Sequence, residues 1–149
     1  MKDKATDRSK SKEVTAYGQA SVFLVEEDRE ARRTLRALLQ RWGYTVIAKK
    51  TTREAENFLV EVKGENIGLI IFDMNLNPVS KELEGYAFFR RQTAANPGLP
   101  FILISTDYTI WDLPAVRSMT EHFLTKPFDP EVLRTVVRSI LMARNRGEY

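Results

Sequence analysis

Five short apolar runs without polar interruptions, separated by segments with helical spacing, constrain the fold more than any other feature of this sequence. The runs occupy residues 22–25, 45–48, 67–72, 101–104 and 123–125. A strand exposed to water on one face alternates apolar and polar residues, whereas a strand covered on both faces reads as a continuous apolar run. We therefore expect five strands of a parallel sheet with helices on both of its faces.

The segments between and after these runs carry the spacing and the end signals of helices. In the first segment, apolar residues recur every three or four positions, and most of its arginines lie on the other side. In the second, Thr51 followed by Glu54 forms a capping-box pattern. In the last, Asp129 and Pro130 are a typical cap residue and first helical residue. We expect two further helices, over about 84–93 and, in a shorter form, after Pro114.

Length and composition are those of one globular domain with a leader. The chain has 149 residues, of which 43% are hydrophobic and 29% are charged, enough for one substantial core. Residues 1–20 are rich in Lys, Ser and Thr without any periodicity, and we expect them to form a flexible leader. The folded domain is expected over 21–143, followed by a tail over 144–149.

Cysteine, histidine and charge exclude several classes of function. The absence of cysteine excludes a disulfide scaffold and a cysteine nucleophile, and one histidine cannot form a multi-histidine zinc site. The net charge of +3 comes from the ends, because residues 21–140 hold sixteen basic and sixteen acidic residues, and no direct contact with nucleic acid is expected. The apolar runs are too short to span a membrane and no signal peptide is visible, so we expect a soluble, cytoplasmic protein.

Polar residues follow the expected strands at their carboxyl ends. Glu26 and Glu27 follow the first strand, Asp73 the third, Ser105 the fourth and Lys126 the fifth. In open parallel sheets, ligands bind outside the carboxyl ends, where the strand order reverses. We expect the flavodoxin-like α/β doubly wound order 2-1-3-4-5, in which the first and third strands are neighbours. That order brings three carboxylates together, with a hydroxyl and an ammonium at the same edge.

Such a group of carboxylates favours a bound cation and phosphoryl chemistry. Like charges in a partly buried pocket cannot all remain ionised without a proton or a counter-charge. Mg²⁺ prefers one or two carboxylates together with water and phosphate oxygens. Asp73 is then a nucleophile able to form an aspartyl phosphate. Lys126 and the Ser105 hydroxyl are placed to neutralise or contact a transferred phosphoryl group.

Four short motifs at these strand ends carry a family resemblance. They are VEED at 25–28, IFDMNL at 71–76, LIST at 103–106 and FLTKPF at 123–128. Their order, spacing and shared position resemble the response-regulator receiver domain of two-component signalling, over about residues 21–141. The resemblance implies that Asp73 is the phosphoacceptor. It also implies that Mg²⁺ lies among Glu26, Glu27, Asp73 and the carbonyl of Asn75.

The resemblance assigns further roles at the fourth and fifth strands. It implies that Lys126 contacts the phosphoryl group next to a cis bond to Pro127, and that Ser105 and Phe123 reorient together as a switch. It also implies a sensor histidine kinase or phosphotransfer protein as phosphodonor and a downstream protein as target, with a homodimer as a further option. A phosphoacceptor of this kind signals through a changed surface and is not a turnover enzyme.

Departures from the family pattern motivate a second hypothesis. Glu27 stands where receivers usually have Asp, and its extra methylene displaces the carboxylate or the ion. Thr106 stands where a small residue is usual. A degenerate receiver, which docks partners without phosphorylation, is therefore the alternative. A phosphatase using Asp73 as nucleophile lacks a second acid at Asn75, and a flavin carrier would need a phosphate loop where the acidic run lies.

Simpler interpretations of the same residues also remain open. The acidic residues 26–28 could only open a helix, whose N-terminus favours carboxylates. Lys126 could pair with Asp73 for structural reasons alone. The hydroxyl of Ser105 could form a turn.

Overall fold

The computed structural model describes residues 21–62, 66–73, 81–107, 109, 112, 114–120 and 122–147. Every strand and helix expected above is present, with small shifts at the ends. The strands and helices are β1 (Ser21–Val25), α2 (Arg29–Arg41), β2 (Val46–Lys49), α3 (Thr52–Val62), β3 (Ile67–Asp73), α4 (Lys81–Ala95), β4 (Phe101–Ser105), α5 (Pro114–Met119), β5 (His122–Thr125) and α6 (Pro130–Asn145). The expected leader over 1–20 lies outside the described residues, and α6 extends into the first part of the expected tail.

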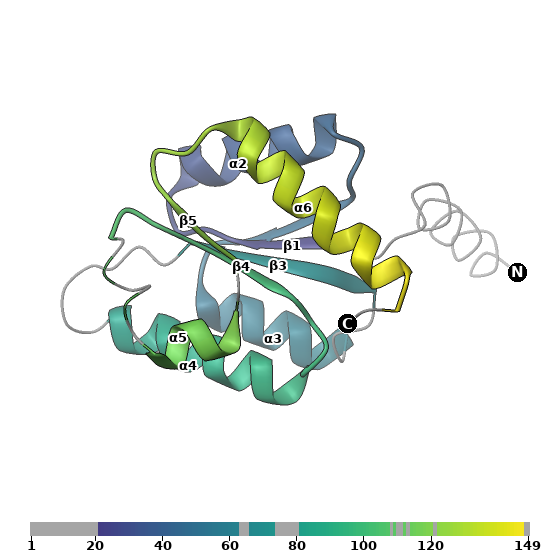
Figure 1. Ribbon diagram of the computed structural model, residues 1–149. Coiled ribbons are helices and arrows are strands. Elements are labelled where there is room, and N and C mark those ends of the chain that lie inside the picture. The colour runs from purple at the N-terminus through teal and green to yellow at the C-terminus, as the bar shows by residue number, and fades with distance from the viewer. Residues whose placement is uncertain are drawn as a thin grey trace, which may run out of the picture.

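The strands form one parallel sheet in the order β2-β1-β3-β4-β5, which confirms the predicted topology. Helices α2 and α6 cover one face of this sheet, and α3, α4 and α5 cover the other (Figure 1). A parallel sheet needs both faces covered because its strands carry apolar side chains in both directions. No helix in the described part of the chain is long and apolar enough to cross a membrane.

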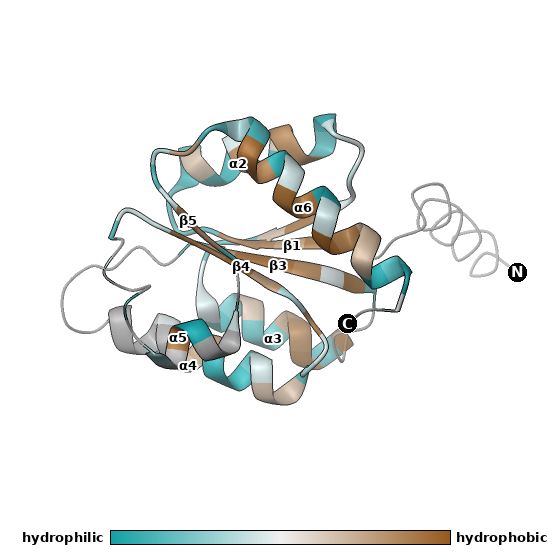
Figure 2. Ribbon diagram, in the orientation of Figure 1, coloured by the Kyte–Doolittle hydropathy of each residue, from teal (hydrophilic) through white to brown (hydrophobic). Residues whose placement is uncertain are grey.

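Alternate strand residues divide the interior into two cores, and the brown strands at the centre of Figure 2 show how apolar they are. In β1, Val22 and Leu24 belong to the core beneath α2 and α6, whereas Phe23 and Val25 belong to the core beneath α3, α4 and α5. The second core is the aromatic one, with edge-to-face pairs Phe72–Phe88 and Phe89–Phe101.

The ends of the helices follow the predicted signals closely. Asp129 caps α6 by accepting a hydrogen bond from the amide of Glu131. At α3, Thr51 Oγ1 accepts from the Glu54 amide at 3.1 Å, as in a capping box. The reciprocal bond differs from the expected one, because Glu54 Oε2 accepts from the amide of Lys50, one residue before the cap, at 3.3 Å. Helix entry is fixed at each of these sites by a side chain that the sequence identifies.

The register of the strands decides which residues meet at the carboxyl edge. Val25 of β1 lies opposite Phe72 of β3, so the next residues along, Glu26 and Asp73, come side by side. Side chains alternate along a strand, so Glu26 and Asp73 lie on the same side of the sheet as Leu24 and Ile71, which belong to the core beneath α2 and α6. Ser105 is the last residue of β4 and alternates to the opposite face, the face of the aromatic core. The edge therefore presents acids on one side of the sheet and a hydroxyl on the other.

Candidate functional site

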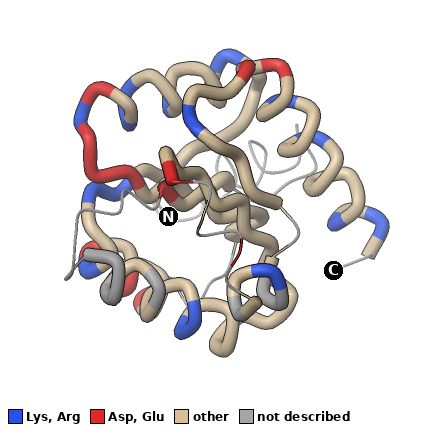
Figure 3. Tube along the Cα trace, turned by 60° about the vertical axis from the view of Figure 1, so that its left-hand side comes forward, with Lys and Arg blue, Asp and Glu red and all other residues tan. Residues whose placement is uncertain are grey.

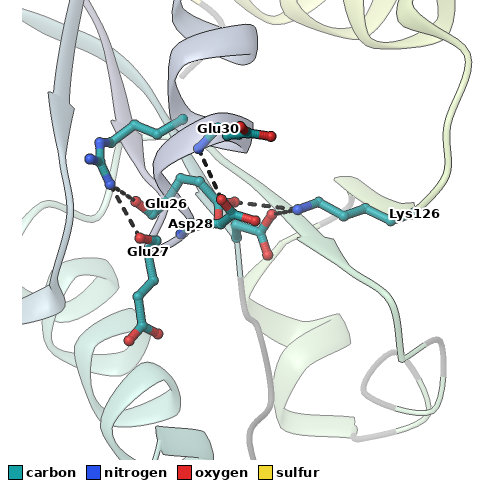
Figure 4. A network of polar contacts seen from close by, with 7 residues as sticks. Glu26, Glu27, Asp28, Glu30 and Lys126 are labelled. Carbon is teal, nitrogen blue, oxygen red and sulfur yellow. Dashed lines mark hydrogen bonds and ion pairs between the residues drawn. The ribbon is translucent and has the colours of Figure 1, made fainter.

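Two buried carboxylates and one ammonium meet at the carboxyl edge of the sheet. Glu26 is fully buried at 0% exposure and Asp73 is 5% exposed, although both carry groups that prefer water when ionised. The Lys126 ammonium lies 3.4 Å from Glu26 Oε2 and also forms an ion pair with Asp73 Oδ2. The labelled pair Glu26 and Lys126 can be followed in Figure 4. The ammonium of Lys126 is thus shared between the carboxyl groups of Glu26 and Asp73.

Burial and the neighbouring acid change the protonation of Glu26. Burial first, and the neighbouring Asp73 second, raise the pKa of Glu26 from 4.5 to about 8, against the opposing effects of the Asp28 amide and Lys126. Partial burial acts to lower the pKa of Lys126, but the two carboxylates outweigh it and raise that pKa above 10.5. A proton on Glu26 relieves the repulsion that Lys126 alone cannot neutralise.

Asp73 is short of hydrogen-bond donors. Among the described residues, neither of its carboxylate oxygens accepts a hydrogen bond of good geometry, although Oδ2 touches the ammonium. A buried carboxylate normally accepts several hydrogen bonds, and leaving it without them is costly. A proton on Glu26, or a cation at the edge, would supply a partner. Asp73 therefore has the surroundings of a group that is kept available for a ligand.

The three acids after β1 have three different roles, and in Figure 3 they form one continuous red stretch leading into α2. Glu26 turns inward, and its Oε1 accepts from the Asp28 amide at 2.9 Å. Asp28 caps α2 by accepting from the Glu30 amide at 2.9 Å, so the helix-opening interpretation is correct for Asp28. Glu27 is exposed, and its side chain runs away from the Lys126 ammonium (Figure 4). The structure brings together Glu26, Asp73 and Lys126 but does not bring the Glu27 carboxylate to them.

The sequence did not identify Arg32 as part of this edge. Its Nη1 donates to the carbonyl oxygens of Glu26 at 3.0 Å and of Glu27 at 3.2 Å. Helical spacing predicts that most arginines of α2 lie on its outward side, but Arg32 is half-buried. The signal was its position six residues after Glu26, which places it on the first turn and a half of the helix, back over the strand end.

Ser105 and Phe123 lie on the other side of the sheet. Ser105 is fully buried, and its Oγ accepts from the amide of Asp107 at 3.0 Å, the turn-forming contact weighed above. Its carbonyl accepts from the backbone amide of Lys126 at 2.8 Å, which ties the ends of β4 and β5 together. Phe123 is half-buried and packs against the aromatic core. A hydroxyl at the end of β4 and an aromatic ring of β5 thus lie toward the aromatic core.

Comparison with known proteins decides the family. A sequence model of the response regulator receiver domain matches residues 22–138, most of the chain. The chain belongs to the response regulator receiver domain family. Its family membership confirms the resemblance inferred from the four motifs.

Three relatives illustrate the match. This receiver is 30% identical over 109 residues to the C4-dicarboxylate transport transcriptional regulatory protein DctD of Rhizobium meliloti, covering 72% of this chain and 22% of that protein. It is 32% identical over 142 residues to the sensor kinase CckA of Brucella abortus, covering 93% of this chain and 13% of that protein. The response regulator TrrA of Thermotoga maritima, solved in complex with Mg(2+)-BeF, superposes with a TM-score of 0.70 at 17% identity, covering 83% of this chain and 100% of that one. The receiver therefore spans only a small part of these two curated relatives, and the structural likeness shows the fold.

The donor set suits the cation that the family implies. In the described part of the receiver, no three Asp, Glu, His or Cys side chains gather closely enough to hold a metal ion. Two buried carboxylates are nevertheless sufficient for Mg²⁺, which completes its shell with water and phosphate oxygens. The oxygens of Asp73 that lack hydrogen bonds fit this role. Asn75, the expected carbonyl ligand, lies outside the described residues, and Glu27 as a ligand stays a prediction.

One geometric expectation at the fifth strand is met. The Lys126–Pro127 peptide bond is cis, as the resemblance implied. Lys126 thus has its ammonium at the acids and its backbone amide on the carbonyl of Ser105.

Proposed function

We propose that this receiver is a phosphoacceptor switch in which Asp73 accepts a phosphoryl group from a histidine kinase or phosphotransfer protein. The observation that carries the proposal is the state of Asp73: it is buried, short of hydrogen bonds and in contact with one ammonium. A structural ion pair would have its remaining lone pairs satisfied. Among the described residues, neither oxygen of Asp73 has a hydrogen-bond partner, and the Lys126 ammonium contacts Oδ2.

The chain's own residues account for most of the transfer step. A carboxylate oxygen of Asp73 attacks the phosphorus of the donor phosphohistidine, the new O–P bond forms as the P–N bond breaks, and the imidazole leaves with the bonding electrons and takes a proton from water. Lys126 is placed to neutralise charge on the transferred group. Bound Mg²⁺, held by Glu26 and Asp73, would neutralise further phosphoryl charge.

Glu26 has a second task in this scheme. In the free receiver its raised pKa keeps a proton in the acidic pair near neutral pH. That proton must leave before the Glu26 carboxylate becomes a full cation ligand. Glu26 therefore couples the charge of the site to the arrival of the cation.

Phosphodonor labelling tests the proposal. The wild-type receiver, incubated with acetyl phosphate and Mg²⁺, should gain the mass of one phosphoryl group in an intact-mass measurement. Asp73→Asn should lose this gain. Asp28→Asn is the matched control, because it changes a nearby exposed side chain that caps α2 and keeps the backbone amide that contacts Glu26. No gain in the wild type, or an equal gain in Asp73→Asn, would refute the proposal.

One observation favours a second candidate, a docking module that works without phosphate. Glu27 is longer than the usual Asp and its side chain runs away from Lys126. If this orientation persists, the cation loses one carboxylate. Amide NMR signals near Asp73 that stay unmoved in millimolar Mg²⁺, while a partner still binds, would favour this candidate.

The remaining features of the proposed function follow from the phosphoacceptor role. We expect a cytoplasmic protein with a downstream protein target, and formation of a homodimer is an option that light scattering with and without phosphodonor tests. We also expect at most slow self-dephosphorylation. Steady-state turnover of phosphate esters would show that the receiver is an enzyme instead.

A further inference from the structure

The loop between β1 and α2 is held by one side chain from the helix it leads into. Arg32 Nη1 donates to two successive carbonyl oxygens, those of Glu26 and Glu27. The backbone amide of Glu26 donates to the carbonyl of Lys49 at 3.1 Å, and the amide of Asp28 donates to Glu26 Oε1. Arg32 thus supplies donors for the two carbonyls of the loop that point toward the helix.

These contacts bear directly on where the Glu26 carboxylate lies. Its Oε1 is fixed by the Asp28 amide, so its direction depends on the backbone conformation of the loop. Its Oε2 then faces the Lys126 ammonium at 3.4 Å. If the loop relaxes, the Glu26 side chain loses the amide that orients it, and a buried polar group without its hydrogen-bond partner is costly.

From these contacts we infer that Arg32 is a positioning residue for the cation site. Its guanidinium holds the β1–α2 loop so that Glu26 faces Asp73, and it acts on the site only through the loop. The inference rests on the proposed function for the identity of the cation, Mg²⁺. Groups that orient metal ligands from outside typically change metal affinity by about 10–100-fold when removed.

Charge and geometry give opposite expectations for this residue, which makes the inference testable. Arg32 is positive, so a purely electrostatic role would oppose cation binding, and its removal would tighten Mg²⁺ binding. A positioning role predicts weaker binding after removal. Arg33, the next residue, is exposed, and its removal deletes the same charge without touching the loop.

Three variants separate these roles by isothermal titration with MgCl₂. Arg32→Ala should bind Mg²⁺ about 10-fold more weakly than the wild type. Arg32→Lys keeps the charge without the planar donor group and should also bind more weakly. Arg33→Ala should bind as tightly as the wild type or slightly tighter. Circular dichroism confirms that each variant is folded.

A measurement without metal tests the loop itself. In EDTA, the amide of Asp28 should exchange with solvent about 10-fold faster in Arg32→Ala than in Arg33→Ala, because its acceptor Glu26 is no longer held. Equal exchange rates, or Mg²⁺ binding in Arg32→Ala as tight as in Arg33→Ala, would overturn the inference. These results for Arg32 would not affect the proposed phosphoacceptor function, provided that the wild type is labelled and Asp73→Asn is not. If the wild type is not labelled, the proposed function fails, and the exchange rate of Asp28 still decides the role of Arg32.

Discussion

Replacing Glu26 with glutamine should remove most of the pH dependence of folding stability near neutral pH. Glu26 has a pKa of about 8 in the folded receiver and an ordinary value of 4.5. Between these values the folded chain holds one more proton than the unfolded chain. The contribution of this proton to the free energy of unfolding is therefore fully present below the lower pKa. It is lost as the pH rises through the higher pKa.

The size of this effect follows from linkage. One extra bound proton gives a slope of about 1.4 kcal/mol per pH unit. Over the interval between the two pKa values, the free energy of unfolding of the wild type falls by an amount on the order of 5 kcal/mol. A neutral amide of the same shape has no proton to lose, so Glu26→Gln should show little of this slope.

Equilibrium unfolding in guanidinium chloride with EDTA measures this directly, at about pH 5.5, 6.5 and 7.5. The difference in unfolding free energy between Glu26→Gln and wild type should shift in favour of the variant by about 1 kcal/mol or more for each pH unit. Glu27→Gln is the matched control, since its exposed side chain lies outside the buried pair, and it should keep the wild-type slope. Parallel profiles for wild type and Glu26→Gln would show that no proton is held at Glu26.

Three further predictions concern the same edge of the sheet. The Mg²⁺ affinity of the wild type should rise with pH between about 6 and 8, because cation binding displaces the proton on Glu26, and it should stay nearly constant in Glu26→Gln. Titration calorimetry in two buffers measures the proton that is released. Lys126→Met should lower the free energy of unfolding by about 3 kcal/mol at about pH 7.5, because it leaves two acids without an ammonium. Adding Asp73→Asn should recover much of this loss, which chemical denaturation of both variants measures. Asp28→Ala should cost about 1 kcal/mol by removing the cap of α2; an equal stability for Asp28→Ala and the wild type in thermal unfolding would contradict the capping role.

The sequence was sufficient for the topology because the apolar runs are unambiguous. A run such as that of β3, followed at once by Asp73, has few structural options once both faces are apolar. The order of the strands follows from short connections and a fixed crossover hand. Glu26, Asp73 and Lys126 could be placed together from strand ends alone, since the carboxyl ends of parallel strands share one edge.

The details of the β1–α2 loop were beyond sequence reasoning for a physical reason. Glu26 and Glu27 are identical in type and adjacent, yet one is buried and the other exposed. Which of them turns inward depends on the alternation carried over from β1 and on the carbonyl contacts of Arg32. Helical spacing assigned Arg32 to the outer stripe, because a pattern of residue types does not show that a long side chain folds back over the helix start.

The polar groups at the carboxyl edge are divided between the two sides of the sheet, and this division has a consequence for how substitutions can act. Glu26 and Asp73 lie on the side of the sheet whose core is beneath α2 and α6, whereas Ser105 and Phe123 lie on the side of the aromatic core. Under the proposed function, substitutions on the side of the acids would change how long a phosphoryl group on Asp73 persists, and substitutions on the other side would change how strongly a partner recognises it. The hydrogen bond from the Lys126 backbone amide to the Ser105 carbonyl joins the two sides, so under the proposed function these two properties could change separately while the ends of β4 and β5 stay connected.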